Sequence, residues 1–185
     1  NAADFEAMNE VYRSFWPKDP PVRTTVVAGL VLPDALIEIS LVALRKGVER
    51  KVILPGGWQR SPNYSYGIQS GDTLFLAGLV ARDNKTNAPN TGDMTAQTKQ
   101  VMDNAGEILQ AAGMTHADVV SSRVYITDVA KFQDMNAAYR GYFTKDPPAR
   151  ATVRAALMNA QYTVEITLLA VKSADRQAIV PLDES

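Results

Sequence analysis

Apolar positions recur along this chain with two different periods, and the period separates the predicted helices from the predicted strands. Residues 93–112 place their apolar side chains on one face of a helix, and Gly113 follows where a left-handed C-cap is expected. Residues 131–143 show the same helical spacing. Short apolar or alternating runs bounded by turn residues predict strands at 63–69, 73–80, 119–126, 149–157 and 162–171. The order β-β-α-β-α-β-β indicates an α+β domain, with a mixed β-sheet and two helices packed on one face.

Part of this pattern occurs twice. Residues 4–45 align with residues 131–172 without a gap, at a constant offset of 127, and share the string Lys-Asp-Pro-Pro-x-Arg. The match is too specific for chance, and we interpret it as a duplication. The expected organisation is the back half of a first domain at 1–46 (a helix plus two strands), a linker at 47–57, a complete domain at 58–172 and a mobile tail at 173–185.

A short solenoid is the alternative explanation of the repeat. Solenoid repeats of ~20–45 residues stack directly on one another in sets of three or more, whereas these two repeats lie much farther apart. A helix and two strands cannot bury a core on their own. We therefore expect the first half-domain to pair with a missing partner, either a separate N-terminal fragment or a neighbouring chain.

Composition excludes several classes of function. The chain has 185 residues, 46% of them hydrophobic, and a formal net charge of −1, which is typical of a globular domain and argues against a nucleic-acid partner. No apolar run reaches the ~20 residues of a membrane span, so no membrane partner is expected. The first residues form no signal peptide pattern, and the expected location is cytoplasmic. The lack of cysteine excludes thiolate chemistry, and the single His116 excludes a multi-histidine metal site.

Two charged residues near the end of the chain are candidates for chemistry. Arg150 follows a Pro-Pro corner that orients its guanidinium, whose planar fork of donors matches a carboxylate. Glu165 interrupts an apolar strand, where a carboxyl group must be paired, hydrated or functional. The structural alternatives are a salt bridge of Arg150, for example with Glu165 itself, and a satisfied buried acid at Glu165. Burial would otherwise raise the pKa of Glu165 into the range that suits acid–base catalysis.

Two uncharged polar residues have less specific interpretations. Tyr64 follows a Pro-Asn turn, where its ring either edges a pocket or anchors the packing. Asn136 lies on the second predicted helix, and the ordinary role of such a side chain is a hydrogen bond that orders a loop.

Several strings, in their order and spacing, resemble the RidA/YjgF family of imine/enamine deaminases. They are LFLAG at 74–78, MDNAGEILQAAGM at 102–114, PPARATV at 147–153 and VEITLLAV at 164–171. The resemblance implies a chorismate-mutase-like fold that assembles as a trimer or, with a duplicated chain, a pseudo-trimer, with clefts between adjacent subunits. It also implies the hydrolysis of small 2-imino or 2-enamino acids to 2-oxo acids and ammonia, with no cofactor and no metal.

The resemblance also assigns roles to residues. Arg150 falls on the family's carboxylate-binding arginine and Glu165 on its water-activating glutamate. Tyr64 falls on the tyrosine that edges the cleft, and Asn136 on the helix asparagine. Arg150 would hold the substrate carboxylate while Glu165 deprotonates a water molecule that adds to the imine carbon.

The chain departs from the family pattern at two substrate-binding positions. Ala77 stands where many members have Ser, and Thr152 where many have Cys, which leaves the substrate range open. The first repeat keeps Arg23, Glu38 and Asn9 at the corresponding positions, and these three residues are a possible second site.

Two other functions remain as alternatives. One is a non-catalytic or regulatory scaffold that binds small carboxylates in the same clefts. The other is a ribonuclease, an activity attributed to some members of the family, which the near-neutral charge and the single histidine disfavour.

Overall fold

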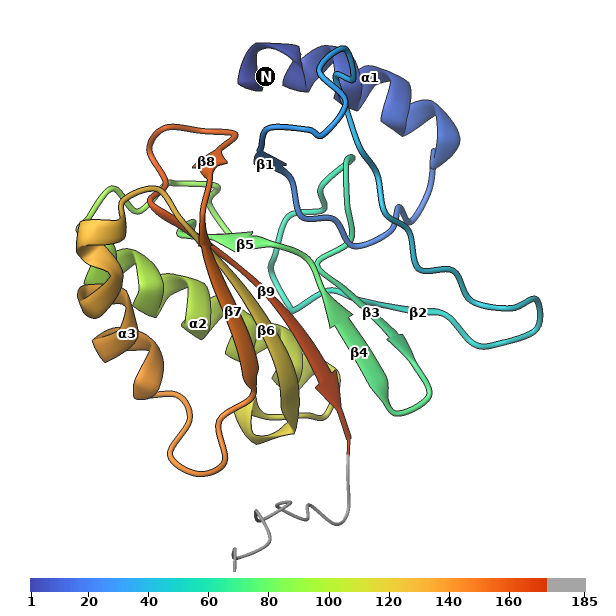
Figure 1. Ribbon diagram of the computed structural model, residues 1–185. Helices are drawn as coiled ribbons and strands as arrows, with labels where there is room; N and C mark the ends of the chain where they lie inside the picture. The colour runs from blue at the N-terminus through green and yellow to red at the C-terminus, as the bar shows by residue number, and fades with distance from the viewer. Residues whose placement is uncertain (173–185) are drawn as a thin grey trace, which may run out of the picture.

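The computed structural model describes residues 1–172, and the predicted tail at 173–185 lies outside the described residues. The chain begins with η1 (Ala2–Asp4), α1 (Phe5–Phe15) and the short β1 (Val26–Val27) (Figure 1). The elements that follow are β2 (Lys51–Ile53), β3 (Gly67–Ser70), β4 (Thr73–Leu76), β5 (Leu79–Val80), α2 (Met94–Ala111), η2 (His116–Asp118), β6 (Val119–Ile126), η3 (Val129–Lys131), α3 (Phe132–Arg140), β7 (Ala149–Arg154), β8 (Ala156–Leu157) and β9 (Val164–Val171).

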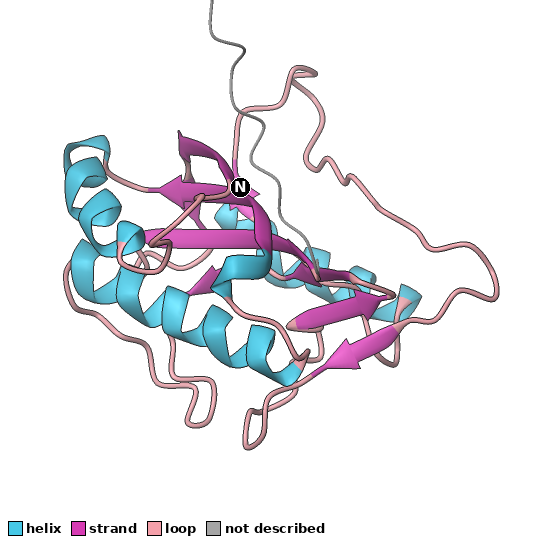
Figure 2. Cartoon of the chain, turned by 90° about the horizontal axis from the view of Figure 1, so that it is seen from below, coloured by secondary structure: helices cyan, strands magenta, loops and turns pink. Residues whose placement is uncertain are grey.

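A seven-stranded sheet forms the body of the molecule. Its strand order is β2-β3-β4-β9-β6-β7. The short β5 pairs with Glu165 and Ile166 of β9, and β4 pairs with residues 169–171 farther along β9. The β6–β7 pair is parallel, and the other neighbours are antiparallel. Both long helices of the body, α2 and α3, lie on the same side of the strands (Figures 1 and 2). The predicted mixed sheet with helices on one face is therefore confirmed.

The hydrophobic core lies between this sheet and α2. β9 alternates strictly, so that Val164, Ile166 and Leu168 face the core and are at most 2% exposed. Ile108 on α2 is fully buried against them in the same cluster. The residues between them on β9, beginning with Glu165, consequently point to the face of the sheet that the two helices leave open.

The N-terminal repeat, residues 4–45, folds only in part like the C-terminal repeat, residues 131–172. Each repeat begins with a helix, and the corner residues Asp19 and Asp146 share a left-handed backbone, with φ of 49° and 47°. The two strands predicted for residues 1–46 do not both form, because β1 is the only strand among these residues and has two residues. Residues 28–50 instead run as an extended loop along the side of the molecule (Figures 1 and 2).

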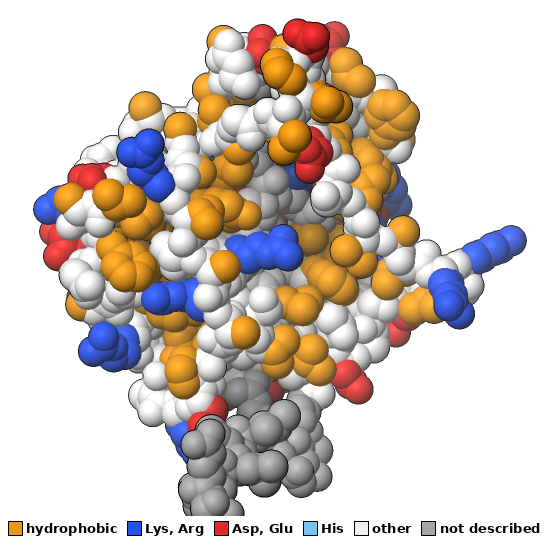
Figure 3. Space-filling view, in the orientation of Figure 1, with side chains coloured by type: hydrophobic (Ala, Val, Ile, Leu, Met, Phe, Trp, Pro, Cys, Tyr) orange, Lys and Arg blue, Asp and Glu red, His pale blue; other side chains and the backbone are white. Residues whose placement is uncertain are grey.

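The second predicted strand fails to form because it lacks neighbours. Its counterpart β9 lies between β4 and β6, and the described part of the N-terminal repeat supplies no equivalent of either strand. The apolar side chains of this loop are consequently exposed, as shown by Val31 at 95%, Leu36 at 81% and Val42 at 80%. In Figure 3, apolar side chains are frequent over these N-terminal segments at the upper right.

The predicted linker at 47–57 also needs correction. Lys51–Ile53 form β2, which pairs with β3, so the sheet begins inside that range. Ile53 is 3% exposed and belongs to the core. The domain therefore starts at about the first residue of β2 rather than at residue 58.

Residues 20–27 attach the N-terminal repeat to the open face of the sheet. The Ser65 hydroxyl donates to the Pro20 carbonyl at 2.5 Å, and the Gly78 amide donates to the Arg23 carbonyl at 3.1 Å. The hydroxyl groups of Thr24 and Thr167 lie 2.6 Å apart, and β1 pairs with β8. Hydrogen bonds thus hold residues 20–27 of the N-terminal repeat next to β5 and β9.

The two repeats provide a matched test of this arrangement, because Leu41 and Leu168 are equivalent positions. Leu168 is 2% exposed and Leu41 is 64% exposed. We predict that Leu168→Ala lowers the free energy of unfolding by about 2–5 kcal/mol through loss of buried apolar area and a residual cavity. Leu41→Ala is expected to change it by less than about 0.5 kcal/mol. Urea denaturation followed by circular dichroism measures both, and an equal loss in the two variants would contradict the exposed loop.

Candidate active site

A cavity of about 420 Å³ lies between the N-terminal repeat and the open face of the sheet. Its wall combines Arg23 and Thr25 of the N-terminal repeat with Tyr64, Arg82 and Glu165 from the rest of the chain. Its size suits a small organic ligand. Both repeats therefore contribute to one site.

Glu165 provides the carboxyl group of this cavity. It is 6% exposed, and its carboxyl approaches the backbone of Gly78 so closely that a Cβ there would lie 2.1 Å from Oε1. Burial raises the pKa of Glu165 to about 7, while the backbone amide of Thr25 and the charge of Arg23 act in the opposite direction. At neutral pH this carboxyl group can therefore either accept or donate a proton.

Arg23 provides a partly buried guanidinium. Its Cζ lies 4.8 Å from the ring centroid of Tyr12 and 5.6 Å from that of Phe5, both on α1. Its Nη1 is buried and has no hydrogen-bond partner within residues 1–172. The rings hold the guanidinium by cation–π contact and leave donors for a ligand. Burial lowers the pKa of Arg23, and the nearby Tyr12, Tyr64 and Glu165 oppose that effect.

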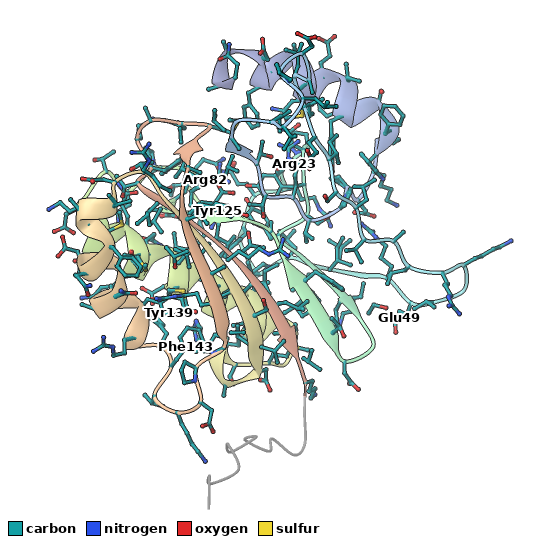
Figure 4. All side chains as sticks on the ribbon, viewed as in Figure 1. Arg23, Glu49, Arg82, Tyr125, Tyr139 and Phe143 are labelled. Carbon is teal, nitrogen blue, oxygen red and sulfur yellow. The ribbon has the colours of Figure 1, made fainter. Side chains whose placement is uncertain are left out.

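Tyr64 and Arg82 form the opposite part of the wall. Arg82 Nη2 donates to the Tyr64 hydroxyl at 2.8 Å, and the Tyr64 ring packs edge-on against Tyr66 with centroids 5.3 Å apart. The phenol oxygen of Tyr64 is thus held in place as an acceptor, and its own proton remains to be donated. Figure 4 labels Arg23 and Arg82 in the same part of the molecule, beneath α1.

The structure does not bring Arg150 and Glu165 together. Arg150 pairs in register with Ser122, which is buried at 1% exposure beneath α3, whereas Glu165 pairs with Tyr125. Positions 122 and 125 of β6 face opposite sides of the sheet, so the two charged side chains do as well. Within this chain the two residues therefore share no crevice, and they form no salt bridge with each other.

Arg150 is instead held against α3. Its Nη2 donates to Asn136 Oδ1 at 2.7 Å, and its Cζ lies 4.9 Å from the centroid of Tyr139 and 5.9 Å from that of Phe132. Tyr139 lies well away from Arg23 in Figure 4. The two ring contacts are equivalent to those of Arg23 with α1. No carboxyl group of the described chain forms an ion pair with Arg150. Asn136 thus orders Arg150 rather than the cavity.

The other predicted substrate-binding residues also lie outside the cavity. Ala77 is fully buried, and its amide donates to the Tyr66 carbonyl at 2.9 Å. Thr152 lies on β7, and its hydroxyl is buried without a partner among the described residues. Of the residues assigned to the site of the second domain, the structure places Glu165 and Tyr64 in the cavity.

The possible second site at Arg23, Glu38 and Asn9 is also divided. Asn9 lies on α1 and is 1% exposed, with both polar side-chain atoms lacking partners within the described chain. Glu38 is exposed on the extended loop, because the strand that would have carried it inward does not form. Arg23 therefore shares a cavity with Glu165 rather than with Glu38.

Sequence reasoning missed three residues of this cavity. Thr25 is the repeat equivalent of Thr152, as Arg23 is of Arg150, so the offset of 127 could have identified both. Gly78 follows Ala77 and gives the Glu165 carboxyl the space it occupies. Arg82 stands in an ordinary turn sequence and gave no signal.

The described residues show neither a metal-binding cluster nor a membrane-spanning helix. Within residues 1–172, no three His, Asp or Glu side chains gather as a metal ion would require. The same part of the chain contains no helix with the length and apolar character to cross a bilayer.

Comparison with known proteins identifies relatives of residues from 59 onward. A family model described as endoribonuclease L-PSP matches residues 59–172. A RutC family protein from Saccharolobus solfataricus is 40% identical over 110 residues, which are 60% of this chain and 87% of the relative. Protein DfrA from Myxococcus xanthus is 37% identical over 110 residues, which are 58% of this chain and 84% of that protein.

Solved structures show the same fold. The crystal structure of RidA from an Antarctic Psychrobacter is 29% identical with a TM-score of 0.62, covering 66% of this chain and 100% of that one. The YjgF gene product of E. coli is 27% identical with a TM-score of 0.62, covering 68% of this chain and 100% of that one. The family model covers more than half of this chain, and the chain therefore belongs to the endoribonuclease L-PSP family, that of the RidA/YjgF proteins.

Proposed function

We propose that this protein hydrolyses 2-imino acids, or their 2-enamino tautomers, to 2-oxo acids and ammonia in the cavity between the two repeats. The observation that supports this most is that one cavity contains both an acid–base group and a cationic group. A buried carboxyl group with a pKa of about 7 shares it with a guanidinium that has an unused buried donor.

Arg23 would bind the substrate carboxylate. A guanidinium binds a carboxylate through two parallel charge-assisted hydrogen bonds, which fix the direction of the attached carbon. The rings of Phe5 and Tyr12 hold Arg23 from the side of α1, and Arg23 also lines the cavity. The imine carbon would then lie in the part of the cavity that contains Glu165.

Glu165 would transfer the proton. In its ionised form it takes a proton from water as the water oxygen bonds to the imine carbon and the C=N electron pair moves to nitrogen. The protonated carboxyl returns this proton to the nitrogen, which gives a neutral carbinolamine. The regenerated carboxylate next takes the hydroxyl proton of the carbinolamine and delivers it to the amine, so that the C–N bond breaks, the C=O bond forms and ammonia leaves. The sum is one imine and one water converted to one oxo acid and one ammonia. A pKa near neutrality suits both halves of this cycle.

The position of the single histidine favours this reaction over RNA cleavage. His116 Nε2 lies 3.1 Å from the carbonyl of Met102 on α2, on the helix side of the sheet. No imidazole of the described chain lines the cavity. The described chain therefore supplies no histidine acid or base in this cavity for the RNA cleavage that the family description names.

The expected assembly with other subunits is not required for this site. The guanidinium, the carboxyl group and the phenol of the cavity all belong to one chain. We propose that the N-terminal repeat takes, within the chain, the place that a neighbouring subunit holds in the clefts expected from the family.

The two repeated arginines give the sharpest test of the site. We predict that Arg23→Ala lowers kcat/KM for a 2-imino acid about 100-fold, because charge-assisted hydrogen bonds of ~1.5–3 kcal/mol to the substrate are lost. Arg150→Ala is expected to lower it less than about threefold, since Arg150 faces the other side of the sheet. Ammonia release above the spontaneous rate measures both. A larger loss in Arg150→Ala than in Arg23→Ala would overturn this assignment.

Activity should also follow the ionisation of Glu165. Because the ionised carboxylate is the base, kcat/KM should rise with pH and reach half of its plateau near the pKa of about 7. Glu165→Gln should abolish both the activity and this pH dependence while succinate or butanoate still binds. The measurement is the rate at each pH after subtraction of spontaneous hydrolysis. If the wild type only matches the spontaneous rate while carboxylates bind, the protein is a binding scaffold.

A further inference from the structure

Arg82 is a second cation in the cavity that the proposed reaction does not use. We propose that the cavity takes a 2-imino acid with a second anionic group, and that Arg82 binds this second group as Arg23 binds the first. This inference rests on the proposed function and adds the substrate class: short 2-imino dicarboxylates rather than imino acids with apolar side chains.

The hydrogen bonds of Arg82 leave its charge without a counterion. Nη2 donates to the Tyr64 hydroxyl at 2.8 Å and lies 3.5 Å from that of Tyr66, and Nε donates to Asn84 Oδ1 at 3.4 Å. All three acceptors are neutral. Within residues 1–172, no carboxylate lies within 4.0 Å of Arg82. A partly buried guanidinium surrounded by neutral groups favours an anion as its missing partner.

The charges of the cavity as a whole indicate the same ligand. Arg60 at the rim already forms an ion pair with Asp19 at 3.3 Å. Arg23 and Arg82 remain, and the one carboxyl group that faces them, Glu165, has a pKa of about 7 and is only partly ionised at neutral pH. A substrate with one carboxylate would neutralise one guanidinium and leave the other without a partner. A substrate with two anionic groups neutralises both.

Tyr64 sets the arrangement of the two cations. Its phenol accepts a hydrogen bond from Arg82, and Tyr64 is also near enough to Arg23 to act on the pKa of Arg23 in the raising direction. The edge-on packing of Tyr64 against Tyr66 fixes the ring from the core side. Both guanidinium groups therefore line the same cavity as this fixed side chain, which suits the two ends of a short dianion.

The test separates binding from catalysis. Calorimetry with the full chain compares succinate with butanoate, which have the same number of carbons and differ by one carboxylate. We expect succinate to bind the wild type at least about tenfold more tightly. Arg82→Met should remove this preference, Arg82→Lys should retain part of it, and the matched control Arg123→Met, at an exposed position of β6, should leave it unchanged. Equal binding of the two ligands to the wild type would overturn the inference.

The second measurement uses imines generated in situ by amino acid oxidases, iminosuccinate from aspartate and 2-iminobutanoate from 2-aminobutanoate. Arg82→Met should lower kcat/KM for iminosuccinate at least about tenfold more than it lowers kcat/KM for 2-iminobutanoate. Equal losses for both substrates would mean that Arg82 only supports Tyr64, and the inference would fail. If succinate is preferred but neither imine is hydrolysed, the substrate class stands as a binding preference and the proposed deaminase activity fails.

Discussion

A carboxyl group held out of water in the middle of a sheet is the constraint on which the rest of this molecule depends. Glu165 alternates with core residues on β9, and α2 and α3 leave its own side of the sheet open (Figures 1 and 2). Residues 20–27 provide that cover, and with them come a guanidinium and a backbone amide that face the carboxyl group. The burial that raises the pKa of Glu165 and the charge that moderates it are therefore parts of one packing arrangement.

The two repeats show how one local structure acquires two roles. Arg23 and Arg150 follow equivalent corners of the chain. Each lies over an equivalent phenylalanine–tyrosine pair, on α1 for Arg23 and on α3 for Arg150. Around Arg23 the rest of the chain adds Glu165 and Tyr64, and a cavity results. Arg150 instead donates to Asn136 of its own repeat, and the residue is exposed. What packs against each repeat therefore decides whether its arginine lines a cavity with a carboxyl group.

The family match and the cavity do not have the same boundaries. Residues 59–172 carry the match, yet Arg23 and Thr25 of the cavity precede them in the chain. Any account of this protein that keeps only the matched segment would remove the guanidinium beside Glu165. The N-terminal repeat is consequently part of the functional unit in our proposal, although its last segment, residues 28–45, forms no strand.

The sequence alone determined the order of helices and strands from residue 63 onward, the repeat, and the presence of a carboxyl group among apolar neighbours on the last strand. Those features depend on local periodicity and identity, which can be read from neighbouring residues. Only the tertiary structure decided which arginine meets Glu165, because sheet register places Arg150 and Glu165 on opposite faces and no local pattern encodes register between distant strands. It likewise decided that residues 37–44 stay exposed while the equivalent residues form β9, since a strand requires hydrogen-bonded neighbours that its own sequence does not contain.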